Sequence, residues 1–213
     1  MKSGNFFMDK KNVSAIIDYI RCYGIETHYA VVIRLDPTYC KNPTWKNMMN
    51  NLPSSVMSAM SLRLNQKEGI YNPSPPVNIV AARPKFKPRE HAEFRLLTGG
   101  QNSPVEKMLA HKDKNSCLIF FSKLSPCLQL CLNQTEMNNI VNLVNPLFNR
   151  YNRDSRAFVF ETIYEPDAQK GTEIVLEAWK LIKDAPLFRY PRNAALCFDN
   201  NNQPSNKSPC WDD

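Results

Sequence analysis

Apolar residues recur along the chain with two periods, one typical of helices and the other of strands. In VSAIIDYIRCY, residues 13–23, they return every three or four positions and Gly24 follows, which predicts a helix ended by glycine. CLIFFS, residues 117–122, is a continuous apolar run, as in a central strand buried on both faces. Helices and strands are therefore expected to alternate.

The same patterns predict the other elements. Strands are expected at residues 28–35, 77–81, 117–122, 157–164 and 187–190. Helices are expected at residues 13–23, 54–64, 92–97, 172–185 with Thr172 as its cap, and from SPCLQLC at 125–131 to about 144, where Pro146 would end the helix. This alternation predicts an α/β sandwich with a sheet covered on both faces.

Length and composition indicate one domain, because 213 residues with 43% apolar and 22% charged side chains are ordinary for a globular protein. We expect the domain to span residues 1–199, with an insertion rich in Asn, Pro, Ser and Met at about 39–76 and a loop-like tail at 200–213. No apolar run approaches the roughly 18 residues of a membrane span. We expect no membrane partner, and nothing indicates an obligate protein partner.

Charge and cysteine content indicate a partner and a compartment. The net charge is +7, which favours a polyanionic partner. Seven cysteines are more than a cytosolic domain without metal usually carries, and they favour a secretory route. The opening residues lack a hydrophobic signal segment. We therefore expect a secreted protein whose signal peptide has been removed; a cytoplasmic protein is the alternative.

The motif SPCLQLC contains two cysteines, Cys127 and Cys131, four positions apart. On a helix they would share one face, but helical backbone seldom permits a disulfide at this spacing, so metal binding is the better explanation. Of the three histidines, only His91 is closely followed by an acid in a suggestive spacing, in the triplet HAE; His28 opens a strand and His111 lies in a polar loop. Helix starts at both motifs would keep the thiolates deprotonated.

A zinc ion held by His91, Cys127 and Cys131 would have three protein ligands, which leaves a fourth position for water. Three ligands are typical of a catalytic site. Zinc there lowers the pKa of its water, and Glu93, which is not a ligand, would carry the proton. A closed structural site with a fourth protein ligand is the alternative.

The two motifs, HAE at residues 91–93 and PCLQLC at 126–131, resemble the H-x-E…P-C-x-x-C signature of the zinc-dependent nucleobase deaminases. The aromatic strand before SPC, and TIY at 162–164, are similar to the AID/APOBEC branch. HAEFRLL and LIFFSKLSPCLQLCLN are most similar to the secreted AID/APOBEC-like deaminases of vertebrates. The resemblance implies a cytidine-deaminase-like three-layer α/β/α sandwich around a mixed five-stranded sheet.

The sequence departs from the family pattern at two points. Three residues separate Cys127 from Cys131, where the commonest deaminase pattern has two. Leu124 stands where AID/APOBEC proteins usually carry a Trp that walls the base pocket.

Positive charge precedes the first motif, because RPKFKPR at residues 83–89 alternates four basic residues with Phe86. Such charge at the rim of the site would suit phosphates. The resemblance implies that the loop after the fourth strand and the loop before the first strand also contact nucleic acid. The residues expected to contact nucleic acid are therefore Arg83, Lys85, Lys87, Arg89, Tyr164, His28 and Tyr29.

These features together predict a zinc-dependent hydrolase that converts cytosine to uracil in single-stranded DNA or RNA. One alternative is a deaminase of free cytidine or deoxycytidine, against which the basic rim argues. Another is a non-catalytic nucleic-acid-binding protein on a deaminase scaffold, against which the intact Glu93 argues.

Five cysteines remain beyond the predicted ligands. Cys117 opens a central strand and is expected to stay a free apolar thiol. Cys197 and Cys210 bracket a polar segment and are expected to pair, whereas Cys22 and Cys40 either pair with each other or find partners in the tail. Such bridges would persist only in an oxidising compartment.

Overall fold

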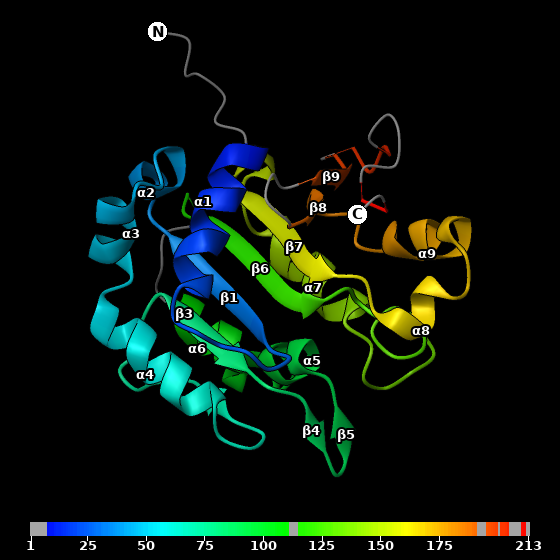
Figure 1. Ribbon diagram of the computed structural model, residues 1–213, viewed down its shortest axis with the longest axis horizontal. Coiled ribbons are helices and arrows are strands. Elements are labelled where there is room, and N and C mark those ends of the chain that lie inside the picture. Colours follow the sequence, from blue (N-terminus) through cyan, green and yellow to red (C-terminus); the bar gives the residue numbers. More distant parts are fainter. Residues whose placement is uncertain (1–7, 111–114, 191–194, 200, 205–209, 212–213) are drawn as a thin grey trace, which may run out of the picture.

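The computed structural model describes residues 8–110, 115–190, 195–199, 201–204 and 210–211. A large mixed sheet lies between two layers of helices (Figure 1). The predicted α/β/α sandwich is therefore confirmed. No helix in these ranges is long and apolar enough to cross a membrane.

Within the described residues the large sheet has seven strands, in the order β2-β3-β1-β6-β7-β8-β9. Their bounds are β1 Ala30–Leu35, β2 Ile70–Tyr71, β3 Ile79–Ala82, β6 Cys117–Leu124, β7 Arg156–Thr162, β8 Leu187–Arg189 and β9 Ala195–Phe198. Strand β6 pairs antiparallel with β1 and parallel with β7, so the sheet is mixed. The five predicted strands are all present. The prediction of five was too low because it missed β2 and β9, which are short strands at the two edges.

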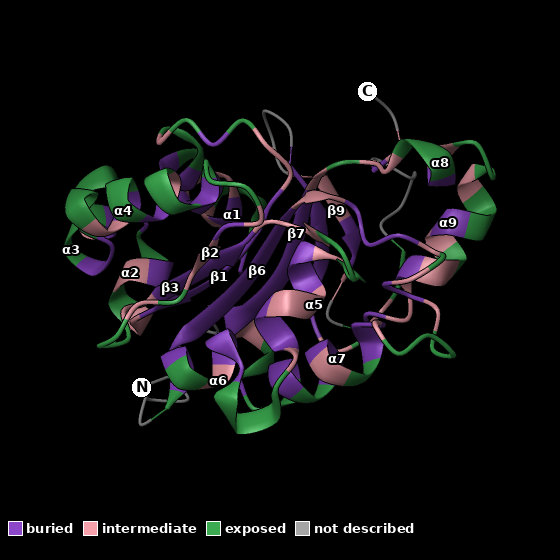
Figure 2. Ribbon diagram, turned by 90° about the horizontal axis from the view of Figure 1, so that it is seen from below, coloured by how far each residue is buried: buried purple, intermediate pink, exposed green. Residues whose placement is uncertain are grey.

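Helices cover the two faces of the sheet separately (Figure 2). One layer contains α1 Lys10–Arg21, α2 Pro37–Lys41, α3 Trp45–Asn51 and α4 Ser54–Leu64. The other contains α5 Ala92–Leu97, α6 Pro104–Leu109, α7 Val141–Asn149 and α9 Thr172–Trp179, with α8 Glu165–Ala168 just before α9. Short 3₁₀ turns lie at Gly100–Asn102 and Arg153–Ser155. A separate hairpin of β4 Lys85–Phe86 and β5 Arg89–Glu90 projects from the body (Figure 1).

Strand β6 contributes side chains to both cores. Leu118 and Phe120 pack in the core under α5, α6, α7 and α9, whereas Ile119 and Phe121 pack in the core under α1 to α4. All four are 0% exposed, which confirms a central strand buried on both faces. Because side chains alternate along a strand, Ser122 lies on the same face as Phe120.

The helix predicted from SPCLQLC to about residue 144 is wrong. Residues 128–131 form turns, and α7 begins only at Val141. The segment NQTEMNN, residues 133–139, is almost entirely polar and has no apolar stripe with which to pack a helix. Pro146 does not end α7 but lies inside it, where one backbone hydrogen bond is lost.

Two other predictions need correction. The insertion at about 39–76 contains three helices, α2, α3 and α4, and not one. The helix at Thr172 ends at Trp179 and not at residue 185, and its cap position is Gly171, with no side-chain capping bond from Thr172. Of the predicted tail, the structure describes residues 201–204 and 210–211 only.

Two disulfides join distant parts of the described chain. Cys197 pairs with Cys210, as predicted, and Cys40 pairs with Cys117. The second bridge corrects two predictions, since Cys117 is not a free thiol and Cys22 does not pair with Cys40. The reason is that α2 carries the buried Cys40 back to the start of β6, whereas Cys22 stays exposed beyond the end of α1.

Removal of the Cys40–Cys117 bridge is expected to lower the free energy of unfolding by up to about 4 kcal/mol, because the bridge spans a sequence separation of 77 residues. Urea unfolding of the Cys40→Ala/Cys117→Ala variant measures this change. The exposed Cys22 provides a matched control, and Cys22→Ala should unfold like the parent. A double variant as stable as the parent would contradict the bridge.

Candidate active site

Three predicted ligands meet beyond the carboxyl end of β6. His91 Nδ1 lies 3.1 Å from Cys131 Sγ and 3.5 Å from Cys127 Sγ, and the two sulfurs are 3.6 Å apart. A tetrahedral zinc ion with bonds of about 2.3 Å to sulfur and about 2.0 Å to nitrogen holds such atoms about 3.5–3.8 Å apart. The two distances to Cys127 Sγ lie in this range and the distance from His91 to Cys131 is shorter, so the three side chains fit one metal ion once His91 and Cys131 separate by a few tenths of an ångström. In the described part of the chain, no fourth His, Cys, Asp or Glu joins this group.

Two segments of the chain place these ligands. His91 is the N-cap residue of α5, in extended backbone, so its ring lies at the start of the helix. Cys127 follows β6, and a tight turn returns Cys131 beside it, with Leu132 N donating to Cys127 O over 3.0 Å. Ile140 N then donates to Cys131 O over 2.8 Å. Thus turns, and not the predicted helix face, bring the two sulfurs together.

A buried carboxylate ties this turn to α8. Asp167, 1% exposed, accepts a hydrogen bond from Leu128 N at 2.8 Å and forms an ion pair with Lys170 at 3.0 Å. At the N-cap of α8, Tyr164 N donates to Ser125 Oγ over 3.0 Å. Sequence reasoning missed Asp167, which no motif marks.

The close contacts change the acidity of the ligands. The hydrogen bond with Cys131, opposed by burial and aided by the hydrogen bond with His91, lowers the pKa of Cys127 to about 3. Burial lowers the pKa of His91, but its hydrogen bond with Cys127 and the charge of Glu93 outweigh this effect and raise it. A thiolate is therefore favoured at Cys127, and a thiolate is the form that binds metal.

Glu93 lies in the first turn of α5 and is 1% exposed. Its Oε1 accepts a hydrogen bond of 2.6 Å from Ser122 Oγ, and its Oε2 has no hydrogen-bond partner in the described structure. Glu93 is not a member of the metal-binding group, yet it lines the same pocket as His91 and Cys127. One carboxylate oxygen is thus held from β6 while the other is available for proton transfer.

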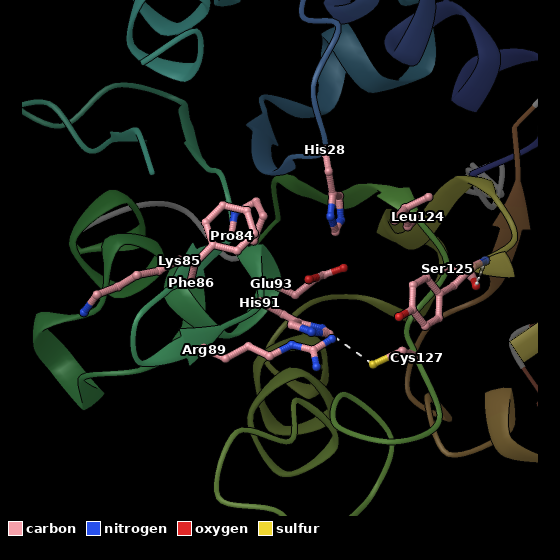
Figure 3. A pocket seen from close by; sticks show the side chains of 11 residues that line it. His28, Pro84, Lys85, Phe86, Arg89, His91, Glu93, Leu124, Ser125 and Cys127 are labelled. Carbon is pink, nitrogen blue, oxygen red and sulfur yellow. Dashed lines mark hydrogen bonds between the residues drawn. The ribbon is translucent and has the colours of Figure 1, made fainter. Parts of the chain in front are cut away.

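The pocket above Glu93 gathers four of the residues predicted to contact nucleic acid, namely His28, Lys85, Arg89 and Tyr164. Figure 3 shows His28 above Glu93, with Leu124 on one side and Pro84 and Phe86 on the other. Burial lowers the pKa of His28, with the charge of Glu93 opposing, and its Nε2 is buried without a described partner.

The other three residues predicted to contact nucleic acid lie outside the pocket. Arg83 donates from Nη1 to Gln66 O over 3.0 Å, and Lys87 is exposed at the hairpin turn. Tyr29 is 1% exposed and packs on Phe121 in the opposite core, so its ring is not available to a nucleic acid. The prediction failed at Tyr29 because this residue, just before β1, belongs to the core opposite the one that contains Cys127. His111 lies outside the described residues.

Sequence reasoning missed two more residues of the site. Ser122 is a polar residue at the end of an otherwise apolar buried run, and that contrast could have marked it. Phe86 is an apolar residue among four cations and is 62% exposed at the pocket mouth.

An α/β/α sandwich with a His-Cys-Cys group beside a buried glutamate defines a deaminase-like protein. The family model described as Secreted Novel AID/APOBEC-like Deaminase 1 matches residues 11–213, and the chain belongs to this family. Comparison with curated proteins and with solved structures finds no match.

One zinc ion per chain is expected on elemental analysis of the purified protein, because three ligand atoms lie within 4.8 Å of one another. The Cys127→Ala variant should lose the metal. Its matched control is Cys22→Ala, which removes an exposed thiol and should retain zinc. A folded parent without metal, or a Cys127→Ala variant with full zinc content, would contradict the site.

Proposed function

We propose that this protein is a zinc-dependent hydrolase that deaminates cytosine to uracil in single-stranded DNA or RNA. The observation that carries the proposal is the arrangement around Glu93, whose carboxylate shares a pocket with the His-Cys-Cys group and keeps Oε2 unpartnered among the described residues. Membership of an AID/APOBEC-like deaminase family supports the same reaction class.

The residues present fit a zinc ion in both donor type and spacing. Held by His91, Cys127 and Cys131, zinc would supply a Lewis acid that lowers the pKa of water to near neutrality. His91 and Cys127 line the pocket together with Glu93, which supports a reaction beside that carboxylate.

Glu93 would act as the proton carrier. Deamination of cytosine consumes one water, of which one proton goes to the ring nitrogen and the other to the amino group, which leaves as ammonia. Glu93 Oε2 is placed for both transfers because it is buried, lines the pocket and accepts no hydrogen bond from the described residues. Ser122 holds the other oxygen, so the carboxylate does not need to turn between the two steps.

The rim supports a polyanionic substrate. Lys85 and Arg89 line the pocket, and neither forms an ion pair with a described residue. The net charge of +7 also favours a polyanionic substrate. A free nucleoside carries no phosphate and would not use these cations.

An extracellular location belongs to the same proposal. The family description contains the word secreted, and two disulfides in the described chain fit an oxidising compartment. Zinc and disulfides together account for six of the seven cysteines.

Glu93→Gln is expected to retain zinc and fold but to lose at least about 100-fold in turnover, because the amide cannot carry the proton. The assay measures uracil formation with single-stranded DNA, single-stranded RNA and free cytidine as parallel substrates. Zinc content and thermal unfolding of the variant control for damage to the site.

Each outcome of this assay separates the alternatives. Turnover of oligonucleotides but not of cytidine supports the proposal. Turnover of cytidine alone would show that the substrate is the free nucleoside and not a polynucleotide. Zinc-loaded parent protein without turnover on any substrate, or a Glu93→Gln variant with parental turnover, would contradict the proposed mechanism.

A further inference from the structure

We propose that Phe86 and Arg89, which lie across from each other on the β4–β5 hairpin, bind the nucleotide beside the target base. Phe86 would stack on that base, and Arg89 would contact its phosphate. This inference rests on the proposed function, since it assigns the polynucleotide a binding element next to the pocket.

The hairpin register places the two residues opposite each other. Phe86 pairs with Arg89 across the two strands, and directly paired residues share one face of a β-ribbon. Both residues line the pocket that contains Glu93. In Figure 3, Lys85 by contrast extends away from Glu93.

Contacts at both strands fix the hairpin to the body. Phe86 N donates to Glu68 Oε1 over 3.0 Å, and Asn138 Nδ2 donates to Arg89 O over 2.9 Å. These bonds hold the backbone from which the exposed ring and the guanidinium extend. A backbone that is already held in place lowers the conformational entropy lost when a base binds.

The chemistry of the pair matches a single-stranded nucleic acid. Phe86 is 62% exposed although it is apolar, and an exposed aromatic ring gains free energy when a planar base covers it. Arg89 is exposed and forms no ion pair with a described residue, so its guanidinium can bind a phosphate through two N–H groups. An aromatic ring next to a cation is the combination that proteins use to follow a single strand.

Direct binding tests the pair without reliance on catalysis. Fluorescence anisotropy with a labelled cytosine-containing single-stranded DNA is measured on zinc-loaded Glu93→Ala protein, alone and with a second substitution. Phe86→Ala is expected to weaken binding by about tenfold or more, and Phe86→Trp to restore it. Arg89→Ala should weaken binding. It should also reduce the slope of log affinity against log salt concentration by about one, which corresponds to the loss of one phosphate contact.

Matched controls lie on other elements. Ile174→Ala removes an apolar side chain that is 57% exposed on α9, and Lys46→Ala removes an exposed cation on α3. Neither should change affinity to the same extent. Phe86→Ala protein that binds like the parent, or Phe86→Trp that binds no better than Phe86→Ala, would overturn the inference.

The results also separate this inference from the proposed function. Tight, Phe86-dependent binding by a parent enzyme that deaminates nothing would leave the inference standing and refute the proposed function. Deamination of oligonucleotides with no contribution of Phe86 to binding would support the proposed function and refute this inference.

A second inference comes from the hydrogen bond beneath the pocket. We infer that Ser122 is a positioning residue for Glu93. Ser122 is 0% exposed and its Oγ lies 2.6 Å from Glu93 Oε1. Its backbone is fixed by pairing with Ala30 on one side and with Phe160 on the other. The hydroxyl therefore defines the orientation of the carboxylate and directs Oε2 toward the pocket.

Ser122→Ala is expected to lower kcat by about 10- to 100-fold, with KM and zinc content unchanged. Ser122→Thr keeps the hydroxyl and should recover most of kcat. A Ser122→Ala enzyme with parental kcat, or one that loses zinc in proportion to its activity, would overturn the inference. If the parent enzyme deaminates nothing, a crystal structure of Ser122→Ala tests the inference through the orientation of the Glu93 carboxylate. A carboxylate in the same orientation as in the parent would overturn the inference.

Discussion

The position of strand β6 between β1 and β7 is the constraint on which the site depends. Hydrogen bonds on both edges and buried side chains on both faces leave this strand a single register. A shift by one residue would turn Ser122 to the other face of the sheet and displace Cys127 from His91. At the other end of β6, Cys117 is fixed to α2 by a disulfide. The strand therefore fixes the metal-binding group and the support of Glu93 together.

The floor and the rim of the pocket are built in different ways. On the floor, Glu93 and Ser122 are buried and hydrogen-bonded, so the proposed catalytic geometry exists before a substrate enters. On the rim, Phe86 and Arg89 are exposed on a short hairpin that touches the body through few bonds. The proposed chemistry is thus assigned to buried residues, and polymer recognition is assigned to exposed ones.

The sequence predicted the features that depend on local pattern. The apolar run of β6 marked the central strand, and the motifs around His91 and Cys127 marked the metal-binding group, which tertiary structure then brought together. The pairing of Cys117 with Cys40 could not be predicted, because it depends on where α2 lies in space. The turn that ends at Cys131 was missed because the spacing of Cys127 and Cys131 suits a helix, although the polar segment at residues 133–139 already argued against one.

The central claim is that the His-Cys-Cys group forms an open, catalytic zinc site. X-ray absorption at the zinc edge of the purified protein tests it most directly, because the method counts the ligand types. An open site held by His91, Cys127 and Cys131 would give two sulfur ligands at about 2.3 Å, one imidazole nitrogen at about 2.0 Å and one further light atom from water. A spectrum with three or four sulfur ligands, or with none, would contradict it.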